Sequence, residues 1–219
     1  MNFIAATVEL KSFISDPVNA YGLDYRAADA VIPAGGSASE VRLRVLCYDR
    51  AGGKLTSFEG WKPGTRALIT GTLMFTDDYT QPLDLIITTI EPNVPADMYC
   101  NQVVLGNAFF ADDQIKERKN NQVAVKIGTS LDNSDVVTWL YLETNEARKK
   151  KLQDRVRKGR AVCVQGYLRE YRKDDSDSPY RAIVSHDFTT RKDRERPGKN
   201  PQTSGSAAGY SEVDPTPDY

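Results

Sequence analysis

The chain has 219 residues, of which 40% are hydrophobic and 27% are charged, and its formal net charge is −1. This composition is typical of globular proteins, and the length accommodates one large domain or two of about 100 residues. No apolar run reaches the roughly 18 residues of a membrane-spanning helix, and the first residues lack the basic and apolar segments of a secretory signal. We therefore expect a cytoplasmic protein that spans no membrane.

The charges are unevenly distributed along the chain. Residues 1–98 contain 8 Lys/Arg and 12 Asp/Glu, residues 99–173 contain 15 and 9, and residues 174–219 contain 6 and 9. This asymmetry predicts a basic domain joined to a more acidic one, with an acidic tail. The three cysteines, Cys47, Cys100 and Cys163, are far apart within apolar strand patterns, which predicts buried reduced thiols and no disulfide framework or CxxC metal site.

The first 95 residues predict an all-β domain. β-branched and alternating apolar residues predict strands at 1–10, within 15–39, and at 41–47, 67–75 and 83–90. In the strand at 41–47, Arg42 and Arg44 point away from the apolar face, because side chains alternate along a strand. Residues 50–61 predict a loop or a short turn of helix, and Pro92 and Pro95 indicate a connector between domains.

The second half repeats this pattern. Strands are predicted at 100–110, 123–127, 136–142, 161–171 and 180–188. Between the third and fourth of them, the sequence predicts a basic helix that has Thr144 as its N-cap and Gly159 as its C-terminal cap. Residues 191–219 change to Pro, Gly, Ser and alternating charges, which predicts a disordered tail.

A fixed offset of 95 residues relates the two halves. It connects Gly64 with Gly159, Gly71 with Gly166, Leu73 with Leu168, and Val41 with Val136. We therefore predict a mainly β protein with two copies of one five-stranded domain, at residues 1–95 and 99–190, each with its helix between the third and fourth strands. That layout is the OB-fold, a partly open barrel that binds oligonucleotides on one face.

Several segments of the second half resemble the bacterial-type single-stranded DNA-binding proteins. The sequence at 101–107 (NQVVLGN) resembles the opening strand of that family, and 120–127 (NNQVAVKI) resembles its second strand. Trp139 followed twenty residues later by a glycine has the family's spacing, and 162–168 (VCVQGYL) resembles the strand after it. Residues 1–95 match more loosely, without the helix motif.

The resemblance implies sequence-nonspecific binding of single-stranded DNA in replication, recombination and repair, in the cytoplasm at the nucleoid, without a cofactor. Members of the family use four OB domains, so a chain with two would form a homodimer, and the N-terminal domain would serve DNA contact or assembly. The tail ends in an acidic, aromatic tip that resembles the family's docking segment for replication and repair proteins. Its candidate residues are Asp214, Asp218 and Tyr219.

A sequence-tolerant site needs aromatic rings for stacking and cations for phosphates. Strand alternation directs Trp139 and Tyr141 away from the core, and it does the same for Tyr167, Arg169 and Tyr171 on a later strand. The other candidates are Arg172 and Lys173 in the following loop, Lys126 on the second strand, and Arg42, Arg44 and Tyr48 in the first repeat. The alternatives are that Trp139 fills the core or a subunit interface, and that the other residues form a solvated surface. For the helix cluster 148–151, a solvated face is favoured.

Three other functions compete with this interpretation. Catalysis is disfavoured because the one histidine, His186, has no accompanying metal or nucleophile motif, and Asp174–Asp177 lacks the spacing of a two-metal site. A primosome-type OB adaptor, which mainly holds proteins together, shares the fold and the binding face. Single-stranded RNA is a further alternative ligand, because stacking and phosphate contacts do not depend on the sugar.

Overall fold

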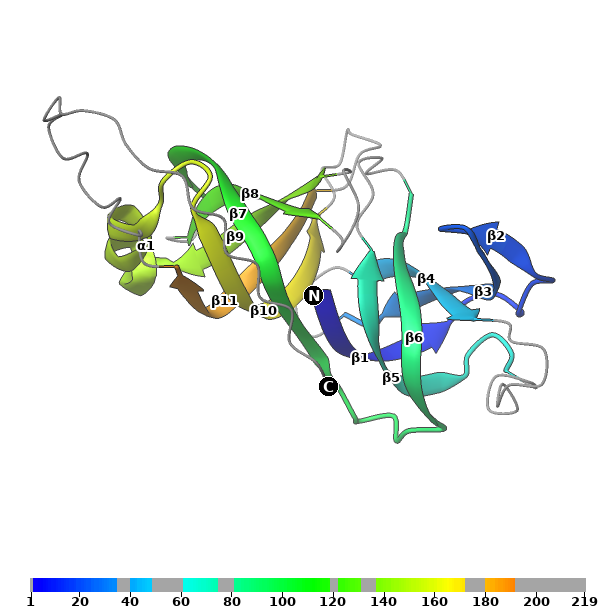
Figure 1. The fold of residues 1–219 in the computed structure, drawn as a ribbon. Helices are drawn as coiled ribbons and strands as arrows, with labels where there is room; N and C mark the ends of the chain where they lie inside the picture. The colour runs from blue at the N-terminus through cyan, green and yellow to red at the C-terminus, as the bar shows by residue number, and fades with distance from the viewer. Residues whose placement is uncertain are drawn as a thin grey trace, which may run out of the picture.

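The computed structural model describes residues 2–34, 40–48, 61–74, 81–118, 122–130, 137–171 and 180–191. It is mainly β (Figure 1). The strands of the first half are β1 (Asn2–Leu10), β2 (Val18–Ala20), β3 (Leu23–Ile32), β4 (Val41–Tyr48), β5 (Arg66–Met74) and β6 (Leu83–Pro92). The second half contains β7 (Asn101–Glu117), β8 (Gln122–Ser130), β9 (Val137–Asn145), the 3₁₀ turn η2 (Glu146–Arg148), α1 (Lys149–Arg155), β10 (Ala161–Tyr171) and β11 (Tyr180–Thr190). None of the helices in these ranges is long and apolar enough to cross a membrane.

Strands β7 to β11 close into a five-stranded barrel, which we call the C-terminal barrel. β7 pairs with β8, β8 with β9, β9 in parallel with β11, β11 with β10, and β10 again with β7. The core fills its interior: Val125, Leu142, Ile183 and Leu168 lie in register on four adjacent strands, and each is at most 2% exposed. α1 lies at the end of this barrel that is remote from the N-terminal half (Figure 1).

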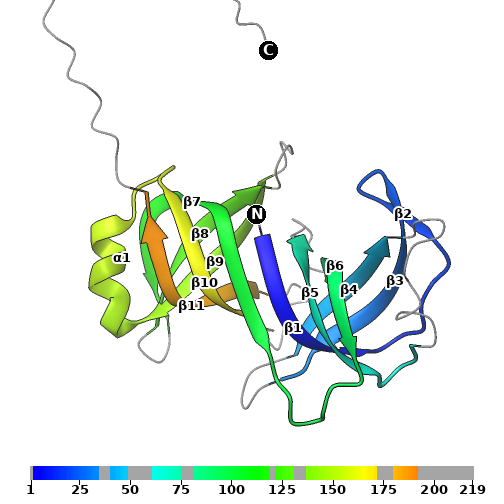
Figure 2. The same ribbon diagram turned by 60° about the horizontal axis from the view of Figure 1, so that its bottom comes forward.

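The N-terminal half uses the same order of pairings. β1 pairs with β3, β3 with β4, β4 in parallel with β6, β6 with β5, and β5 with β1. The pairing of β1 with β3 consists of two residue pairs, Glu9 with Val31 and Leu10 with Ala30. The short β2, which the sequence did not predict separately, extends β3 as a hairpin arm (Figure 2).

Antiparallel pairing between β1 and β7 joins the two halves. It runs from Asn2 opposite Leu105 to Ala6 opposite Asn101 and connects all strands into one 11-stranded sheet. In both ribbon views these two strands lie side by side at the centre of the molecule (Figures 1 and 2). The backbone hydrogen bonds of the sheet therefore continue from one half into the other.

The glycines that repeat at an offset of 95 have the same conformational roles in the two halves. Gly64 and Gly159 both have positive φ, +87° and +76°, in the turns before β5 and β10. Gly71 and Gly166 each lie at a β-bulge, where an added Cβ would be 2.1 and 2.2 Å from a backbone carbonyl oxygen of the next strand. The offset therefore marks the same turn and the same bulge in each half, positions where a side chain is strained or excluded.

The predicted limits of the helix were wrong. β9 continues to Asn145, and Thr144 is a buried strand residue opposite Val123 instead of an N-cap. α1 begins at Lys149 and ends four residues before Gly159, whose N–H donates to the carbonyl of Phe110. Strand pairing thus overrides the local capping pattern. The corresponding helix of the first repeat, if residues 50–60 form one, lies outside the described residues, as does the tail beyond Arg191.

The prediction that all three cysteines are buried was also wrong. Cys47 is buried, whereas Cys100 is half-buried and Cys163 is exposed. Cys163 lies between Val162 and Val164, which both point into the core, so strand alternation directs its thiol outward.

Candidate nucleic-acid interface

The outer surface of the C-terminal barrel carries most of the candidate residues. Lys126, Tyr141, Ala182 and Arg169 lie in register on β8, β9, β11 and β10. Each of these residues is the sequence neighbour of one of the four core residues named above. Because neighbouring side chains in a strand point to opposite faces, these four point to the outside of the barrel. With strands about 4.8 Å apart, the set extends across roughly 14 Å of the barrel surface. The predicted outward direction of Trp139 and Tyr141 is confirmed, since both are half-buried while Thr138, Leu140 and Leu142 are buried.

Trp139 is packed against Phe109 above a glycine. Phe109, Gly128 and Trp139 are in register on β7, β8 and β9, and the two rings meet edge to face with centroids 5.8 Å apart. A Cβ on Gly128 would be 2.7 Å from an atom of each ring, so the absence of a side chain allows them to lie over the strand. The Lys126 ammonium is 4.9 Å from the Trp139 ring centroid, in cation–π geometry.

Two further cations surround Tyr141. The ammonium of Lys116 and the guanidinium carbon of Arg118 are 5.7 and 5.3 Å from its ring centroid. Lys116 belongs to the far end of β7, which continues past a register shift between Phe110 and Ile115, and Arg118 directly follows the strand. The predicted strand ended at Phe110, so these two cations were missed.

On β10, Tyr167, Arg169 and Tyr171 form a continuous stack, as their shared face predicted. The guanidinium carbon of Arg169 is 5.5 Å from the Tyr167 ring and 5.4 Å from the Tyr171 ring, and Arg169 donates a hydrogen bond of 3.1 Å to the Tyr171 hydroxyl. Tyr171 donates in turn to Glu143, at 2.7 Å. Burial, reinforced by this bond to a carboxylate and opposed by Arg169, raises the pKa of Tyr171 to about 12. The phenol is therefore protonated at neutral pH.

Small residues form the floor of this surface. Ala124 and Ala182 are completely buried although each is in register with outward-facing neighbours, Ala124 with Lys116 and Ala182 with Tyr141 and Arg169. Methyl side chains at these positions let the larger rings and cations lie flat over the strands. We call the surface formed by Phe109, Lys116, Arg118, Lys126, Trp139, Tyr141, Tyr167, Arg169 and Tyr171 the aromatic–cation face.

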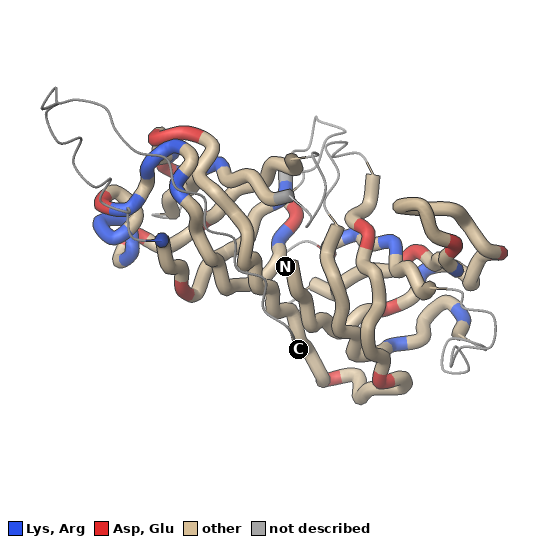
Figure 3. The backbone as a smooth tube through the Cα atoms, in the orientation of Figure 1, with Lys and Arg blue, Asp and Glu red and all other residues tan. Residues whose placement is uncertain are grey.

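The basic cluster of the helix occupies a different position. Lys and Arg gather on α1 and the turns beside it, at the end of the barrel (Figure 3). Lys149 forms an ion pair of 2.5 Å with Glu117, and Lys151 forms one of 2.8 Å with Asp187. The neighbouring ammonium groups lower the pKa of both carboxyls. These contacts agree with a helix whose cations face solvent and nearby acids.

In the N-terminal half, the arginine candidates are bound to carboxylates. Arg44 makes two hydrogen bonds, of 2.7 and 2.6 Å, to Asp84, its partner in register on β6, and Tyr21 donates to the same carboxylate at 2.7 Å. Hydrogen bonding to Asp84 raises the pKa of Arg44 further. Tyr48 is 36% exposed and packs edge-on against the buried Tyr25. Of the three candidates in this half, Tyr48 is thus the one with an exposed aromatic ring.

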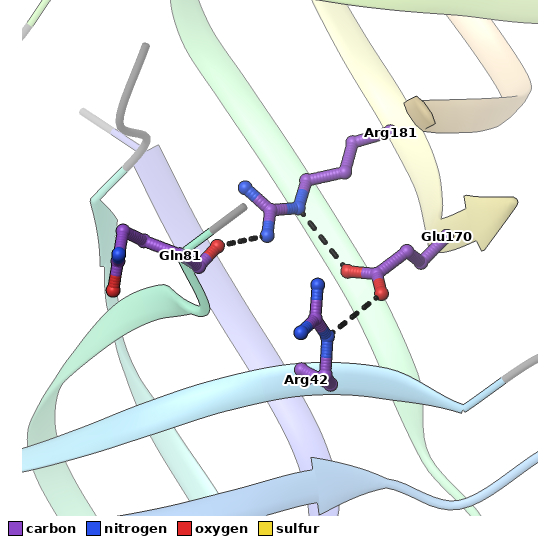
Figure 4. A network of polar contacts seen from close by, with 4 residues as sticks. All are labelled: Arg42, Gln81, Glu170 and Arg181. Atoms are coloured by element: carbon purple, nitrogen blue, oxygen red, sulfur yellow. Dashed lines mark hydrogen bonds and ion pairs between the residues drawn. The ribbon is translucent and has the colours of Figure 1, made fainter. Parts of the chain in front are cut away.

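Arg42 belongs to a polar network between the halves (Figure 4). Its Nε donates to Glu170 at 3.1 Å, and the other carboxylate oxygen of Glu170 accepts from Arg181 at 3.2 Å. Arg181 also donates to the backbone carbonyl of Gln81, just before β6. The side chains of Glu170 and Arg181 are 0% and 2% exposed. The network therefore connects β4 with β10 and β11 in a region shielded from water.

Several predicted residues lie outside the described part of the chain, namely Arg172, Lys173, Asp214, Asp218 and Tyr219. Conversely, Phe109, Lys116, Arg118 and His186 are near the predicted residues and were not predicted as binding residues. Phe109 was signalled by strand alternation, since Ala108 and Phe110 on either side are buried. Within the described ranges there is no cluster of three or more His, Cys, Asp or Glu residues that could hold a metal ion.

The order of strand pairings in the C-terminal barrel is that of an OB-type barrel, and aromatic side chains lie on its outer surface. No protein-family model and no curated protein sequence matches the chain. Among solved structures, the chain is similar to the single-stranded DNA binding protein from Thermus aquaticus: a deletion variant shares 16% identity, with a TM-score of 0.59, over 91% of this chain and 98% of that one. The wild-type protein shares 17% identity over 94% and 97% of the two chains, with a TM-score of 0.54. At this identity, the likeness establishes the fold.

Proposed function

We propose that this protein binds single-stranded DNA without sequence preference, through two OB-type domains, at 1–95 and 99–190, of which the second makes the principal contacts. The observation that carries the proposal is the aromatic–cation face, where four cations lie among aromatic rings across four strands of one barrel. Unpaired bases offer flat faces for stacking and a phosphate at each step, and both are sequence-tolerant. The structural similarity to a single-stranded DNA binding protein, which extends over more than 90% of this chain, supports the same ligand.

Each component of the face has a defined role in the proposal. Trp139, Tyr141 and Tyr167 stack with bases. The ammonium of Lys126 lies over the Trp139 ring on a flexible unbranched stem, so it turns to a phosphate when a base takes the ring. Arg169 and the cations beside Tyr141 contact other phosphates.

The N-terminal half makes a smaller contribution. Arg42 and Arg44 are held by Glu170 and Asp84, so their guanidinium groups stabilise the fold, and Tyr48 is the candidate contact in this half. Two chains would assemble four such domains, and the C-terminal tip with Asp214, Asp218 and Tyr219 would recruit replication and repair proteins. Arg172 and Lys173 would extend the face of β10 along the strand.

A competition titration tests the ligand. Fluorescent oligo(dT) is displaced by poly(dT), poly(U) or duplex DNA at two salt concentrations. Single-stranded DNA should compete best, and four phosphate contacts predict a slope of log K against log salt of about −2.8, from about −0.7 per neutralised phosphate. Lys126→Ala should make the slope shallower by about 0.7, whereas Lys150→Ala on α1 is the matched control. Equal competition by duplex DNA, or binding without salt dependence, would contradict the proposal, and preference for poly(U) would assign RNA as the ligand.

A further inference from the structure

A cavity of about 370 Å³ lies where the aromatic–cation face meets the N-terminal half. Tyr167, Arg169 and His186 line it from the C-terminal barrel, Val41 and Pro33 from the N-terminal half, and Tyr99 from the connector. The volume is within the range of small-molecule pockets, about 300–1,000 Å³.

The cavity lies where the pairing between β10 and β7 ends. The pairing of β10 with β7 ends at Gly166 opposite Val103, whereas the other edge of β7 stays paired with β1 as far as Asn101. Beyond that point the side chain of Asn101 replaces the backbone ladder: it donates to the carbonyl of Leu168 at 2.8 Å and accepts from its N–H at 3.0 Å. β10 is therefore held in place while space remains beside it.

A β-bulge directs His186 into this space. Gln165 pairs with Asp187 and Gly166 with Ser185, so His186 is the extra residue of β11. Bulges re-aim side chains, and here the imidazole lies 5.4 Å from the Tyr167 ring, centroid to centroid, at an interplanar angle of 44°. His186 is exposed, and Tyr99 is 50% exposed. Three aromatic rings thus border one cavity, an arrangement that suits a flat, unsaturated ligand.

The charge of the cavity favours an anion. None of the described residues that line it is Asp or Glu, and Arg169 is the Lys or Arg residue among them. Its Nε is buried without a hydrogen-bond acceptor, and among the described residues its side chain makes one hydrogen bond, to the Tyr171 hydroxyl. A guanidinium has five N–H donors, so Arg169 retains donors for a phosphate.

The walls are fixed before any ligand arrives. Val41 precedes Arg42 on β4, and Arg169 precedes Glu170 on β10, so the ion pair of Arg42 with the buried Glu170 connects these two walls one residue away from the cavity. A preformed pocket loses less entropy when it binds.

We propose that this cavity binds one nucleotide of the bound strand, with its base against Tyr167 and His186 and its phosphate on Arg169. The strand would pass from the aromatic–cation face to the N-terminal half at this point. The inference rests on the proposed single-stranded DNA binding, and it assigns a specific place to one base at the junction of the halves.

The single histidine of the chain provides a direct reporter. The ¹H–¹³C imidazole signal of His186 is followed while oligo(dT) of about 35 nucleotides, longer than two OB-fold sites of up to about 16 each, is added to the full chain. The signal should shift and saturate together with the change in Trp139 fluorescence. Free dTMP at the same nucleotide concentration should shift it little, because the pocket is filled by a base delivered on a strand.

Two exposed positions allow variants that should fold normally. His186→Ala removes one ring and should weaken oligo(dT) binding by about five-fold or more, the effect of losing part of one base stack. Gln102→Phe fills the cavity from a residue outside the aromatic–cation face and should abolish the His186 shift. Phe13→Ala is the control, because it removes a ring that is 72% exposed and does not line the cavity. It should change neither the oligo(dT) affinity nor the shift of the His186 signal.

The outcomes separate the two proposals. If Trp139 responds to oligo(dT) but the His186 signal does not move, the cavity is not a nucleotide site, and single-stranded DNA binding stands. If dTMP alone saturates the shift, the cavity is an independent mononucleotide site, which overturns the path of the strand. If neither residue responds to oligo(dT), both proposals fail.

Discussion

Replacing Glu170 by leucine tests whether the buried carboxylate at the junction of the two halves stabilises the fold. Glu170 accepts hydrogen bonds from Arg42 and Arg181. Its side chain is completely buried, and that of Arg181 is 2% exposed. Removal of one partner of a buried ion pair typically costs about 3–5 kcal/mol, because the other charge stays buried without compensation. Arg42, whose side chain is 34% exposed, can return to water, so the cost falls mainly on Arg181.

The expected loss is large enough for a simple assay. At about 2–4 °C per kcal/mol for a chain of this size, Glu170→Leu should lower Tm by roughly 6–20 °C, and a urea titration should give the corresponding decrease in the free energy of unfolding. The double variant Glu170→Leu/Arg181→Met should recover most of the loss, because apolar replacement of a whole buried pair is often neutral. A single variant with wild-type stability, or a double variant no more stable than the single one, would refute this reasoning.

Three further substitutions test other contacts. Gly128→Ala places a methyl group 2.7 Å from the rings of Phe109 and Trp139, and the displaced rings should lose about 1–3 kcal/mol of oligo(dT) affinity in a fluorescence titration; unchanged affinity would show that the ring pair is not a stacking platform. Arg44→Ala should lower the free energy of unfolding by about 1–2 kcal/mol because Asp84 loses a charged partner, while oligo(dT) affinity should stay near wild type; the reverse result would make Arg44 a DNA ligand. Because the pKa of Tyr171 is raised to about 12 in the fold, its contribution to stability is complete below the unfolded pKa of about 10 and should be lost between about pH 10 and 12 in urea titrations. In Tyr171→Phe the loss should be smaller but still present, because the pKa values of Tyr21 and Tyr25 are also raised by burial; an equal loss in both proteins would contradict the contribution of Tyr171.

Patterns that act along one strand could be predicted from the sequence. Alternation along β9 and β10 gave the outward direction of Trp139, Tyr141, Tyr167 and Arg169 correctly, because a strand with one buried face leaves no other choice. The repeated glycines were also informative, since a turn with positive φ and a bulge each demand glycine.

Contacts between distant strands could not be predicted in this way. Arg44 and Asp84 are 40 residues apart, and Arg42 and Glu170 are 128 apart, so their pairing depends on the register of strands that are not sequence neighbours. The continuation of β1 onto β7 and the cavity beside it likewise arise from the assembly of the two halves. Local signals also misled at Thr144, where the capping pattern is present but pairing with β8 keeps the residue in a strand.

Tryptophan fluorescence tests the central claim most directly, because the chain has two tryptophans in different environments. Trp61 is 7% exposed in the N-terminal half, whereas Trp139 lies on the aromatic–cation face of the C-terminal barrel. Oligo(dT) should quench the fluorescence of the wild type and of Trp61→Phe to saturation, and it should leave that of Trp139→Phe nearly unchanged. Quenching that persists in Trp139→Phe and disappears in Trp61→Phe would place the bound strand elsewhere and contradict the account.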